Sequence, residues 1–508
     1  MIELDGNSLT LETFVDVVRK KHRVTLSDEA KKRVMDSRNI VEKAIERKDV
    51  VYGVNTGFGK LSDVRIDDAD LHTLQKNLIM SHACGTGEPF GLDVVRGMIL
   101  LRINALVKGY SGIRLKTVDK LLEMLNEDVV PVVYSQGSLG ASGDLVPLAH
   151  MVLPLIGEGE VWLEGERLSS REGFEKAGIA PLDSLEAKEG LALINGTQAM
   201  VSVGALTLHD AYKTLWHASL ASAMSFEALR GITDVFDERI HEARGHSGQR
   251  IIASLMGRLL KGSKNTTFQG EERIQDAYSL RCVPQVHGAS LEAFSHIKEK
   301  VETEMNAATD NPLIFSEDSR AISAGNFHGQ VMALPFDYLS IAISELASIS
   351  ERRLERLVNY DLNKRFPPFL ANERGRNSGF MIVQYVAASL VSENKSLAHP
   401  ASVDSIPSSA NQEDHVSMGT IAARKASTIL THTRKVVAYE MMCAAQALDF
   451  SGKETMNSHL KEVFKQIRKE VPFIKEDTVM QPYMAKMEKL LMGERLDDND
   501  MEVLLWTK

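Results

Sequence analysis

Four long helical segments constrain the fold of this chain more than any other feature of its sequence. Apolar residues recur at three- and four-residue spacing between breaks at Gly or Pro, which predicts long helices over 197–230, 284–308, 328–358 and 416–448. In the third segment the spacing produces one apolar stripe, made of Leu339, Ala342, Ile343, Leu346, Ile349 and Leu357. We predict a mainly α fold built as an elongated bundle of long helices, with assembly through the same helices.

The N-terminal region differs in character from the rest of the chain. Strand-like runs there are short, at 129–134 and at 159–168, where we predict a surface hairpin. Neither a linker nor a low-complexity tract divides the sequence. We expect one continuous fold, with a loop-rich N-terminal region over 1–200 that holds the active-site loops and a long-helix region over 201–508. Four glycine-bearing loops occur in the first region: "YGVNTGFGK" (52–60), "ACGTGEPFG" (83–91), "SQGSLGASGD" (135–144) and "INGTQ" (194–198).

Charge and cysteine content argue against several classes of protein. The 59 Lys and Arg residues face 69 Asp and Glu residues without a long basic run, so a nucleic-acid partner is not expected. The three cysteines lie far apart and the 15 histidines form no close ligand pattern, so neither a disulfide framework nor a metal site is predicted. The sequence shows neither a signal peptide nor the ~18 consecutive apolar residues of a membrane span. We expect a cytoplasmic protein that does not bind membranes.

Two common catalytic motifs fail on their spacing. In the loop at 52–60, Val54 occupies the first glycine position of a phosphate-binding loop, and Leu61 follows Lys60 where Ser or Thr is needed. The residues before Ser142 do not match the G-x-S-x-G pattern of a serine nucleophile. From these patterns alone, an ordinary loop with Tyr52 as a core aromatic remains open.

The segment "SQGSLGASGDLVPLAH" (135–150) changes abruptly from small residues to apolar ones. One explanation is a turn followed by a helix, with Asp144 as the N-cap and Pro147 in the first helical turn, where a missing N–H has little consequence. This explanation accounts for the presence of Gly and Ser but not for the large number of these residues in one loop.

The tripeptide Ala141-Ser142-Gly143 permits a second, chemical explanation. If the nitrogen of Gly143 attacks the carbonyl carbon of Ala141, and water is lost from the ring and from the Ser142 side chain, a conjugated methylidene-imidazolone (MIO) forms. Glycine suits this reaction because it lacks Cβ and tolerates a strained, tight approach. The N-terminus of the helix that follows would make the methylidene more electrophilic.

Eight motifs spread over nearly the whole chain form one pattern: "YGVNTGFG" (52–59), "SHACG" (81–85), "QGSLGASGDLVPLAH" (136–150), "LALINGTQ" (191–198), "QDAYSLRCVPQVHG" (275–288), "ATDNPLIF" (308–315), "GNFHG" (325–329) and "SANQEDHVSMG" (409–419). With these motifs the chain closely resembles the histidine ammonia-lyases, members of the aromatic amino acid lyase family. That resemblance implies an MIO group made from residues 141–143 and no external organic cofactor. It also implies elimination of ammonia from L-histidine to give trans-urocanate, the first step of histidine degradation.

The resemblance assigns the central chemical roles. The MIO formed from Ala141, Ser142 and Gly143 would capture the substrate amine, and Tyr52 would be the base that removes the β-proton. A phenol can act in this way only if its pKa falls from about 10, and reaching neutrality requires roughly 4 kcal/mol of phenolate stabilisation. Nearby dipoles or cations must provide it.

Five further positions match the family's binding residues. Arg281 corresponds to the carboxylate clamp, because a guanidinium fork can bind a carboxylate through two parallel hydrogen bonds. Asn195, Gln275 and Tyr278 correspond to polar groups around substrate and MIO, Tyr278 being assigned to the catalytic set. Phe327 resembles an aromatic residue near the prosthetic ring.

His82 and Glu413 bear on the identity of the substrate. An imidazole offers two nitrogens, so a histidine site should supply hydrogen-bonding partners, and a carboxylate can pair with imidazolium. Both residues resemble those of the histidine enzymes, whereas phenylalanine- and tyrosine-directed relatives typically differ there. Departures from the family pattern are limited to Ala324 and Val146, which replace no reactive group.

The resemblance also implies a homotetramer whose active sites draw on more than one subunit. Two other interpretations remain open at this point. One is a lyase or aminomutase for another aromatic amino acid such as L-tyrosine, which would use the same ring and base. The other is a non-catalytic helical assembly that has retained the fold.

Overall fold

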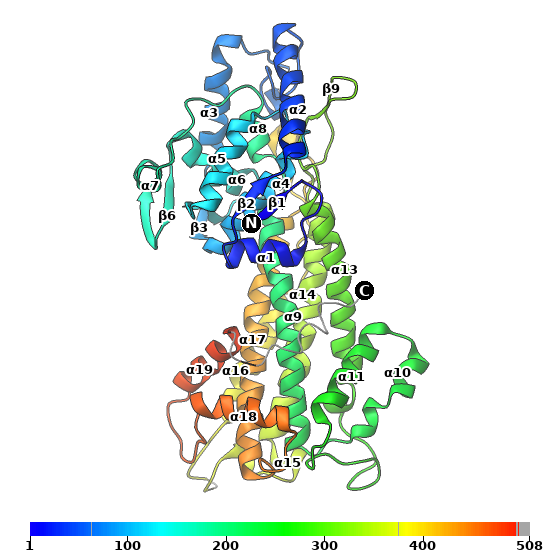
Figure 1. The fold of residues 1–508 in the computed structure, drawn as a ribbon. Helices are drawn as coiled ribbons and strands as arrows, with labels where there is room; N and C mark the ends of the chain where they lie inside the picture. Colours follow the sequence, from blue (N-terminus) through cyan, green and yellow to red (C-terminus); the bar gives the residue numbers. More distant parts are fainter. Residues whose placement is uncertain (62, 374, 494–495, 497–508) are drawn as a thin grey trace. The chain divides into compact units, whose positions relative to one another are not determined.

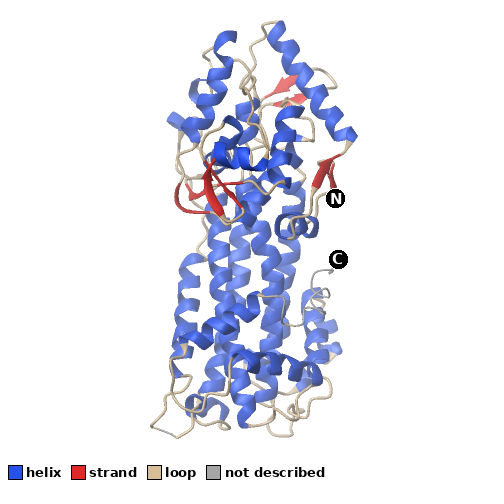
Figure 2. Cartoon of the chain, turned by 60° about the vertical axis from the view of Figure 1, so that its left-hand side comes forward, coloured by secondary structure: helices blue, strands red, loops and turns tan. Residues whose placement is uncertain are grey.

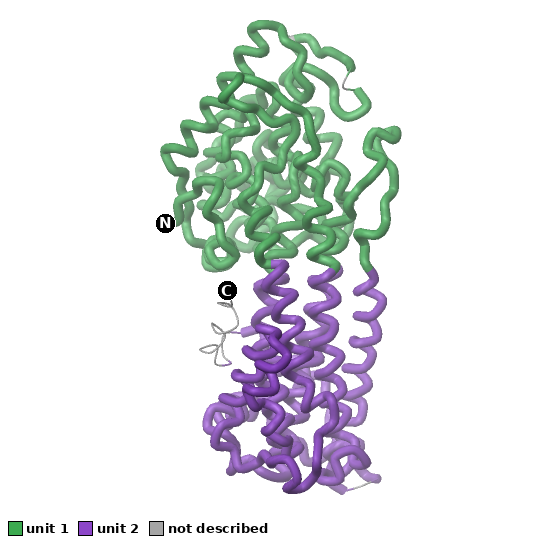
Figure 3. Tube along the Cα trace, turned by 90° about the vertical axis from the view of Figure 1, so that its right-hand side faces the viewer, with its two compact units in different colours: residues 1–206, 298–337, 400–424 green, residues 207–297, 338–399, 425–508 purple. Residues whose placement is uncertain are grey.

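The computed structural model describes residues 1–61, 63–373, 375–493 and 496. The chain forms two compact units, each made of three segments (Figure 3). The first comprises residues 1–206, 298–337 and 400–424, and the second comprises residues 207–297, 338–399 and 425–508. The expected division into 1–200 and 201–508 follows the chain and not these spatial groups, and it stays a prediction.

The four predicted long helices are all present (Figure 1). They are α9 (Gln198–Ala228), α13 (Val283–Met305), α14 (Gln330–Val358) and α17 (Gly419–Phe450). The six residues of the predicted apolar stripe on α14 are all buried. By length and composition, α14 is the one described helix that could cross a membrane, but 61% of its apolar window is buried inside the protein. This burial is what a core helix requires, and the mainly α class is confirmed.

A buried polar cluster fixes three long helices of the second unit to one another. Arg353 on α14 donates from Nε and Nη2 to the two carboxylate oxygens of Glu440 on α17, at 2.6 and 2.9 Å. The hydroxyls of Ser225 on α9 and Ser350 on α14 donate to the same carboxylate, at 2.7 and 2.6 Å. Since a buried ion pair is strongly destabilising when one partner is missing, this cluster specifies how the helices align. The long helices run side by side in Figure 2.

Shorter helices complete the second unit. They are η4 (Thr233–Phe236), α10 (Glu238–Arg244), α11 (Ser247–Leu260), α12 (Tyr278–Arg281), α15 (Tyr360–Asn363), η5 (Pro368–Leu370), α16 (Met381–Leu397), α18 (Ser458–Glu470) and α19 (Gln481–Met492).

The first unit is built around α4 (Leu92–Leu106), which is buried continuously from Val95 to its end. A helix that is buried on all sides must be covered by other elements on all sides, which explains its central place. The other helices are α1 (Leu11–Arg19), α2 (Asp28–Glu46), η1 (Gly59–Leu61), η2 (Asp68–Asp70), α3 (Leu71–His82), α5 (Leu115–Asn126), α6 (Leu145–Val152), η3 (Leu153–Ile156), α7 (Ser170–Ala177), α8 (Glu189–Ile194) and η6 (Ser409–Asn411).

All the described strands belong to the first unit and form small sheets. The predicted hairpin at 159–168 is confirmed as an antiparallel pair, with Leu163 opposite Glu166 at the turn. The predicted strand at 129–134 was only partly right, because it divides between two different sheets. The strands are β1 (Ile2–Leu4), β2 (Val24–Leu26), β3 (Thr86–Pro89), β4 (Val130–Pro131), β5 (Tyr134–Gln136), β6 (Glu160–Leu163), β7 (Glu166–Ser169), β8 (Leu313–Phe315) and β9 (Arg320–Ile322).

Candidate active site

A cavity of about 540 Å³ in the first unit gathers five of the predicted site residues. Loops and helix ends that lie far apart in the sequence contribute to its wall, and most of the remaining lining is apolar. A pocket with a few convergent polar groups in an apolar wall is typical of a small-molecule site. The five residues are Tyr52, His82, Ser142, Asn195 and Glu413.

The backbone at Gly143 has a conformation that only glycine fits. Its φ is +70°, and a Cβ at this position would lie 2.2 Å from the carbonyl oxygen of Gly196. The next residue, Asp144, donates its N–H to the same oxygen at 2.7 Å. The tripeptide therefore sits in a tight cradle that fits the close approach needed for MIO formation.

A distant segment holds the tripeptide loop from the other side. The N–H groups of Ser417 and Met418 donate to the carbonyl oxygens of Gly140 and Leu139, both at 3.2 Å, and the Ser417 hydroxyl donates to Gly140 at 3.0 Å. Ala141 packs with Met418 and its neighbours in a small hydrophobic cluster. The loop is therefore compacted by residues that follow it by more than 270 positions in the sequence.

Asp144 has a different role from the predicted one. It occupies the N-cap position of α6, and Pro147 lies in the first turn as expected, but the Asp144 side chain makes no hydrogen bond to that helix. Its carboxylate instead accepts the N–H of Met200 at 2.8 Å near the start of α9, and the hydroxyls of Ser138 and Thr420. Burial raises the pKa of Asp144, and these hydrogen bonds oppose that rise. The predicted N-cap position is confirmed, but the side chain does not cap α6 because the tertiary fold brings the N-terminus of α9 within its reach.

The hydroxyl of Ser142 donates to Oε1 of Glu413 at 2.9 Å. The other carboxylate oxygen, Oε2, accepts from the hydroxyl of Ser408 at 2.8 Å. The backbones of Ser408 and Glu413 also exchange two hydrogen bonds, at 2.9 and 3.3 Å. The carboxylate is thus fixed in position against the tripeptide.

Tyr52 has an electrostatic environment opposite to the one expected of a base. Its hydroxyl accepts the N–H of Gly59 at 3.2 Å, which lowers the pKa of the phenol. Burial raises the pKa by more than this hydrogen bond lowers it. The charges of Glu413 and Asp310 raise it further, so the pKa of Tyr52 is raised overall. Among the described residues, no cationic group contributes to the pKa of Tyr52, and the expectation of a lowered pKa was wrong for the single chain.

His82 ends α3 and faces the same cavity. Its Nδ1 lies 3.1 Å from the hydroxyl of Ser81. Burial lowers the pKa of His82, and the charge of Glu413 partly offsets this effect. A hydrogen bond to the Leu78 backbone also opposes the effect of burial. The neutral imidazole is favoured, and its tautomer decides which ring nitrogen donates and which accepts.

Asn195 follows α8 directly, and its side-chain oxygen is buried without a hydrogen-bond partner. Arg102 holds the backbone at this point, donating from Nη1 to the Asn195 carbonyl oxygen at 2.8 Å. A buried amide oxygen without a partner is unfavourable unless a ligand satisfies it. Asn195 thus lines the cavity with an unused acceptor.

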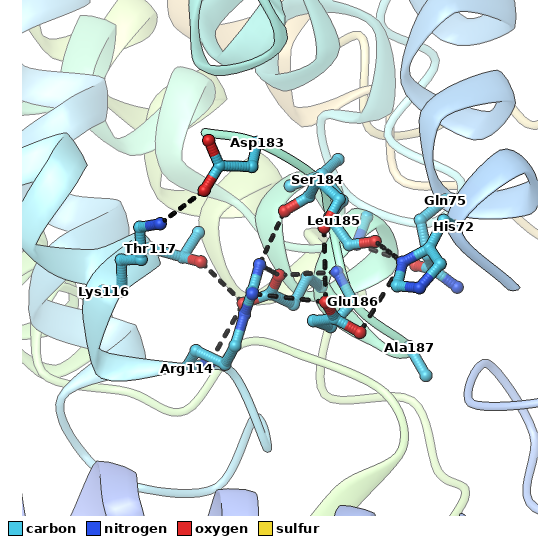
Figure 4. Close-up of polar contacts among 12 residues, drawn as sticks. His72, Gln75, Arg114, Lys116, Thr117, Asp183, Ser184, Leu185, Glu186 and Ala187 are labelled. Atoms are coloured by element: carbon cyan, nitrogen blue, oxygen red, sulfur yellow. Dashed lines mark hydrogen bonds and ion pairs between the residues drawn. The ribbon is translucent and has the colours of Figure 1, made fainter. Parts of the chain in front are cut away.

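A polar network fixes the start of α8 (Figure 4), the helix that Asn195 directly follows. The carboxylate of Glu189, fully buried, accepts from Nη2 of Arg114 and the hydroxyl of Thr117, both at 2.6 Å, and from the N–H of Glu186 at 2.8 Å. Gln75 on α3 accepts the N–H of Gly190 at 2.8 Å. These bonds tie α8 to α3 and to the start of α5, and α3 also contributes residues to the cavity wall.

The remaining predicted residues lie elsewhere. Gln275, Tyr278 and Arg281 belong to the second unit, with Tyr278 70% exposed and the Arg281 guanidinium carbon 4.6 Å from the centre of its ring. Nε of Arg281 is buried without a partner. Phe327 is half-buried in the loop before α14 and is not part of the cavity wall. The first unit thus assembles one part of the predicted site and the second unit holds another.

Several residues of the site region were missed by sequence reasoning. Ser417 and Met418 lie within the motif at 409–419, so the signal was available, whereas Ser408 and Thr420 flank it. Lys188, which pairs with Asp310 in the interior, had no local signal at all. Across the described parts of the chain, no group of three His, Cys, Asp or Glu residues could hold a metal ion.

Comparison with known proteins agrees with this geometry. Residues 9–469 match the family described as aromatic amino acid lyase. The histidine ammonia-lyase of Alkaliphilus oremlandii is 57% identical over 94% of both chains. Among solved structures, histidine ammonia-lyase from Trypanosoma cruzi has 40% identity and a TM-score of 0.90, covering 99% of this chain and 95% of its own. Tyrosine aminomutase from Streptomyces globisporus has 35% identity and a TM-score of 0.93, covering 99% and 98%.

The chain therefore belongs to the aromatic amino acid lyase family. Within that family, its relatives at 53–57% identity over nearly their full length are histidine ammonia-lyases.

Proposed function

We propose that this protein is an ammonia-lyase that converts L-histidine to trans-urocanate and ammonia, the first step of histidine degradation. Histidine ammonia-lyases at 53–57% identity support this activity. The observation in the structure that favours it most is the meeting of Ser142, Glu413 and His82 in one cavity. A ring-forming serine beside a carboxylate and an imidazole suits a substrate with an amine and an imidazole ring.

The prosthetic group in this proposal is the MIO formed from Ala141, Ser142 and Gly143. The glycine-only cradle at Gly143 fits its formation, because ring closure needs the Gly143 nitrogen close to the carbonyl carbon of Ala141. Once formed, this group supplies the electrophile that makes the substrate amine a better leaving group.

The residues of the chain would divide the remaining tasks. Tyr52 faces the cavity and would take the β-proton, while the unpaired amide oxygen of Asn195 would accept a hydrogen bond from the substrate amine. Glu413 and His82 would bind the two imidazole nitrogens. Arg281 would bind the substrate carboxylate.

We further propose a homotetramer with shared active sites. Three large apolar residues between positions 268 and 278 are strongly exposed in the single chain: Phe268 at 61%, Ile274 at 69% and Tyr278 at 70%. Exposed apolar side chains concentrated in one segment favour an interaction surface there. Gln275, Tyr278 and Arg281 would then complete the site of another subunit. Arg281 would also bring a cation toward Tyr52, whose pKa no cation among the described residues of its own chain lowers. The setting would be the cytoplasm, with neither nucleic acid nor membrane as a partner.

Ultraviolet absorbance with purified protein tests this function. Separate cuvettes contain L-histidine, L-tyrosine and L-phenylalanine, and the Ser142→Ala variant serves as the control. We expect a urocanate band with histidine alone and none with the variant. A product from tyrosine would instead favour the aminomutase or lyase alternative, and no product from any amino acid, with an undehydrated intact mass, would favour a non-catalytic role.

A further inference from the structure

The hydroxyl of Ser142 must leave the protein during MIO formation. A hydroxyl group leaves poorly as hydroxide, and it leaves more readily as water when a proton is supplied to its oxygen. In the structure this hydroxyl contacts a carboxylate, with Oγ of Ser142 2.9 Å from Oε1 of Glu413. The Ser408 hydroxyl and the backbone pairing of Ser408 with Glu413 hold that carboxylate in place. An acid–base group is therefore already positioned on the bond that has to break.

One other carboxylate positions the loop, that of Asp144, but its hydrogen bonds are with Ser138, Met200 and Thr420 and not with Ser142. The remaining contacts come from groups that do not titrate. Gly143 is packed against Gly196, and the Ser417 and Met418 amides bind the loop carbonyl groups. These contacts can compact the loop for ring closure, but they offer no proton to Oγ of Ser142. Glu413 is thus the group in the immediate contacts of this hydroxyl that can transfer a proton.

We propose that Glu413 is the acid–base group for the dehydration of Ser142, and so acts in the maturation of the protein as well as in substrate binding. This inference rests on the proposed function, since maturation has meaning only if the MIO forms.

The two losses of water balance as follows. Ring closure joins the nitrogen of Gly143 to the carbonyl carbon of Ala141, and the carbonyl oxygen leaves as water with the amide protons of Gly143 and Ser142. In the second loss, the Cα proton of Ser142 is removed, its electron pair forms the Cα=Cβ bond, and Oγ departs with the electron pair of the Cβ–Oγ bond. Glu413 takes up the Cα proton and passes it to Oγ, so that water leaves and the carboxylate is restored.

Time-resolved intact mass tests the inference without any activity measurement. The full chain is synthesised in a cell-free system, samples are quenched at intervals, and the mass reports the loss of no, one or two waters. We expect Glu413→Gln to slow the second loss at least about tenfold and to accumulate the one-water species, because an amide cannot transfer the proton. Glu413→Asp should recover part of the rate.

The matched control is Asn77→Ala, a variant of another polar residue in the cavity wall, which should mature at the wild-type rate. Loss of two waters by Glu413→Gln at the wild-type rate would overturn the inference. So would equal slowing of both losses in the Gln and Asp variants, since that result indicates a purely structural role. A wild-type chain that loses no water would contradict the proposed function itself, and circular dichroism identifies any variant that is unfolded.

Discussion

Nζ of Lys188 and Oδ2 of Asp310 form an ion pair 2.8 Å apart, with both side chains essentially inaccessible to solvent. Lys188 immediately precedes α8, the helix that ends at Asn195. Burial lowers the pKa of Lys188 and the charge of Asp310 raises it. Asp310 is also one of the two carboxylates that raise the pKa of Tyr52. The pair connects the position of α8 to the electrostatics of the proposed base.

Replacement of Lys188 by Met should destabilise the protein strongly. The substitution leaves the Asp310 carboxylate buried without its partner, and such losses amount to about 3–5 kcal/mol. The free energy of unfolding in urea, at fixed protein concentration, measures the effect. The exposed Lys176, which pairs with Glu164 at the surface, gives the matched variant Lys176→Met, expected within about 0.5 kcal/mol of wild type. If Lys188→Met/Asp310→Asn is no more stable than Lys188→Met alone, the ion pair is not the cause.

Gly143→Ala should damage both stability and maturation. The positive φ alone costs about 1–2 kcal/mol for alanine, and the contact of Cβ with the Gly196 carbonyl adds about 1–3 kcal/mol. Gly165 has a similar positive φ of +83° with no atom near its virtual Cβ, so Gly165→Ala should show only the first effect. Urea unfolding compares the two variants, and intact mass reports dehydration. Equal losses of stability would contradict the tight cradle at Gly143.

The stability of the protein should depend on the protonation of Glu227. Burial raises the pKa of Glu227 to about 7, against the opposing hydrogen bonds, among them the Asn457 N–H at 2.7 Å. Between the ordinary value and this one, the folded protein holds a proton that the unfolded chain has lost, so stability falls as pH rises. We expect this residue to contribute a decrease of up to about 3 kcal/mol from pH 4.5 to 7.

Urea unfolding across this pH range measures the effect. Glu227→Gln should flatten the decrease, whereas Glu175→Gln, a change at an exposed glutamate, should leave it unchanged. A Glu227→Gln profile that is parallel to wild type would show that another group is responsible.

Arg281→Lys should weaken recognition of the substrate carboxylate. A lysine ammonium cannot reproduce the two parallel hydrogen bonds of a guanidinium, so we expect kcat/KM for L-histidine to fall about ten- to a hundredfold. Histamine, which has the imidazole and amine without the carboxylate, should inhibit both proteins equally. If inhibition by histamine weakens to the same extent, Arg281 acts on the general structure of the site and not on the carboxylate.

The local sequence pattern was sufficient to predict elements whose structure depends mainly on their own residues. The long helices were predicted to within a few residues at most of their ends, because an apolar stripe with helical spacing has one way to be buried. The hairpin at 159–168 was also predicted, because its two strands are adjacent in the sequence and are joined by a short turn. The short strands β1, β2, β3, β8 and β9 were missed, since their pairing partners are distant or their runs span only three or four residues.

The sequence by itself determined the class of fold, the ring-forming tripeptide and the motifs that identify the family. These properties depend on residue identity and on spacing along one helix or loop. Only the tertiary structure decided that the Ser142 hydroxyl contacts Glu413, that Asp144 binds the start of α9 instead of its own helix, and that the pKa of Tyr52 is raised. These are relations between groups separated by tens to hundreds of residues. Burial and electrostatic fields arise from all neighbours in space, so no local pattern records them.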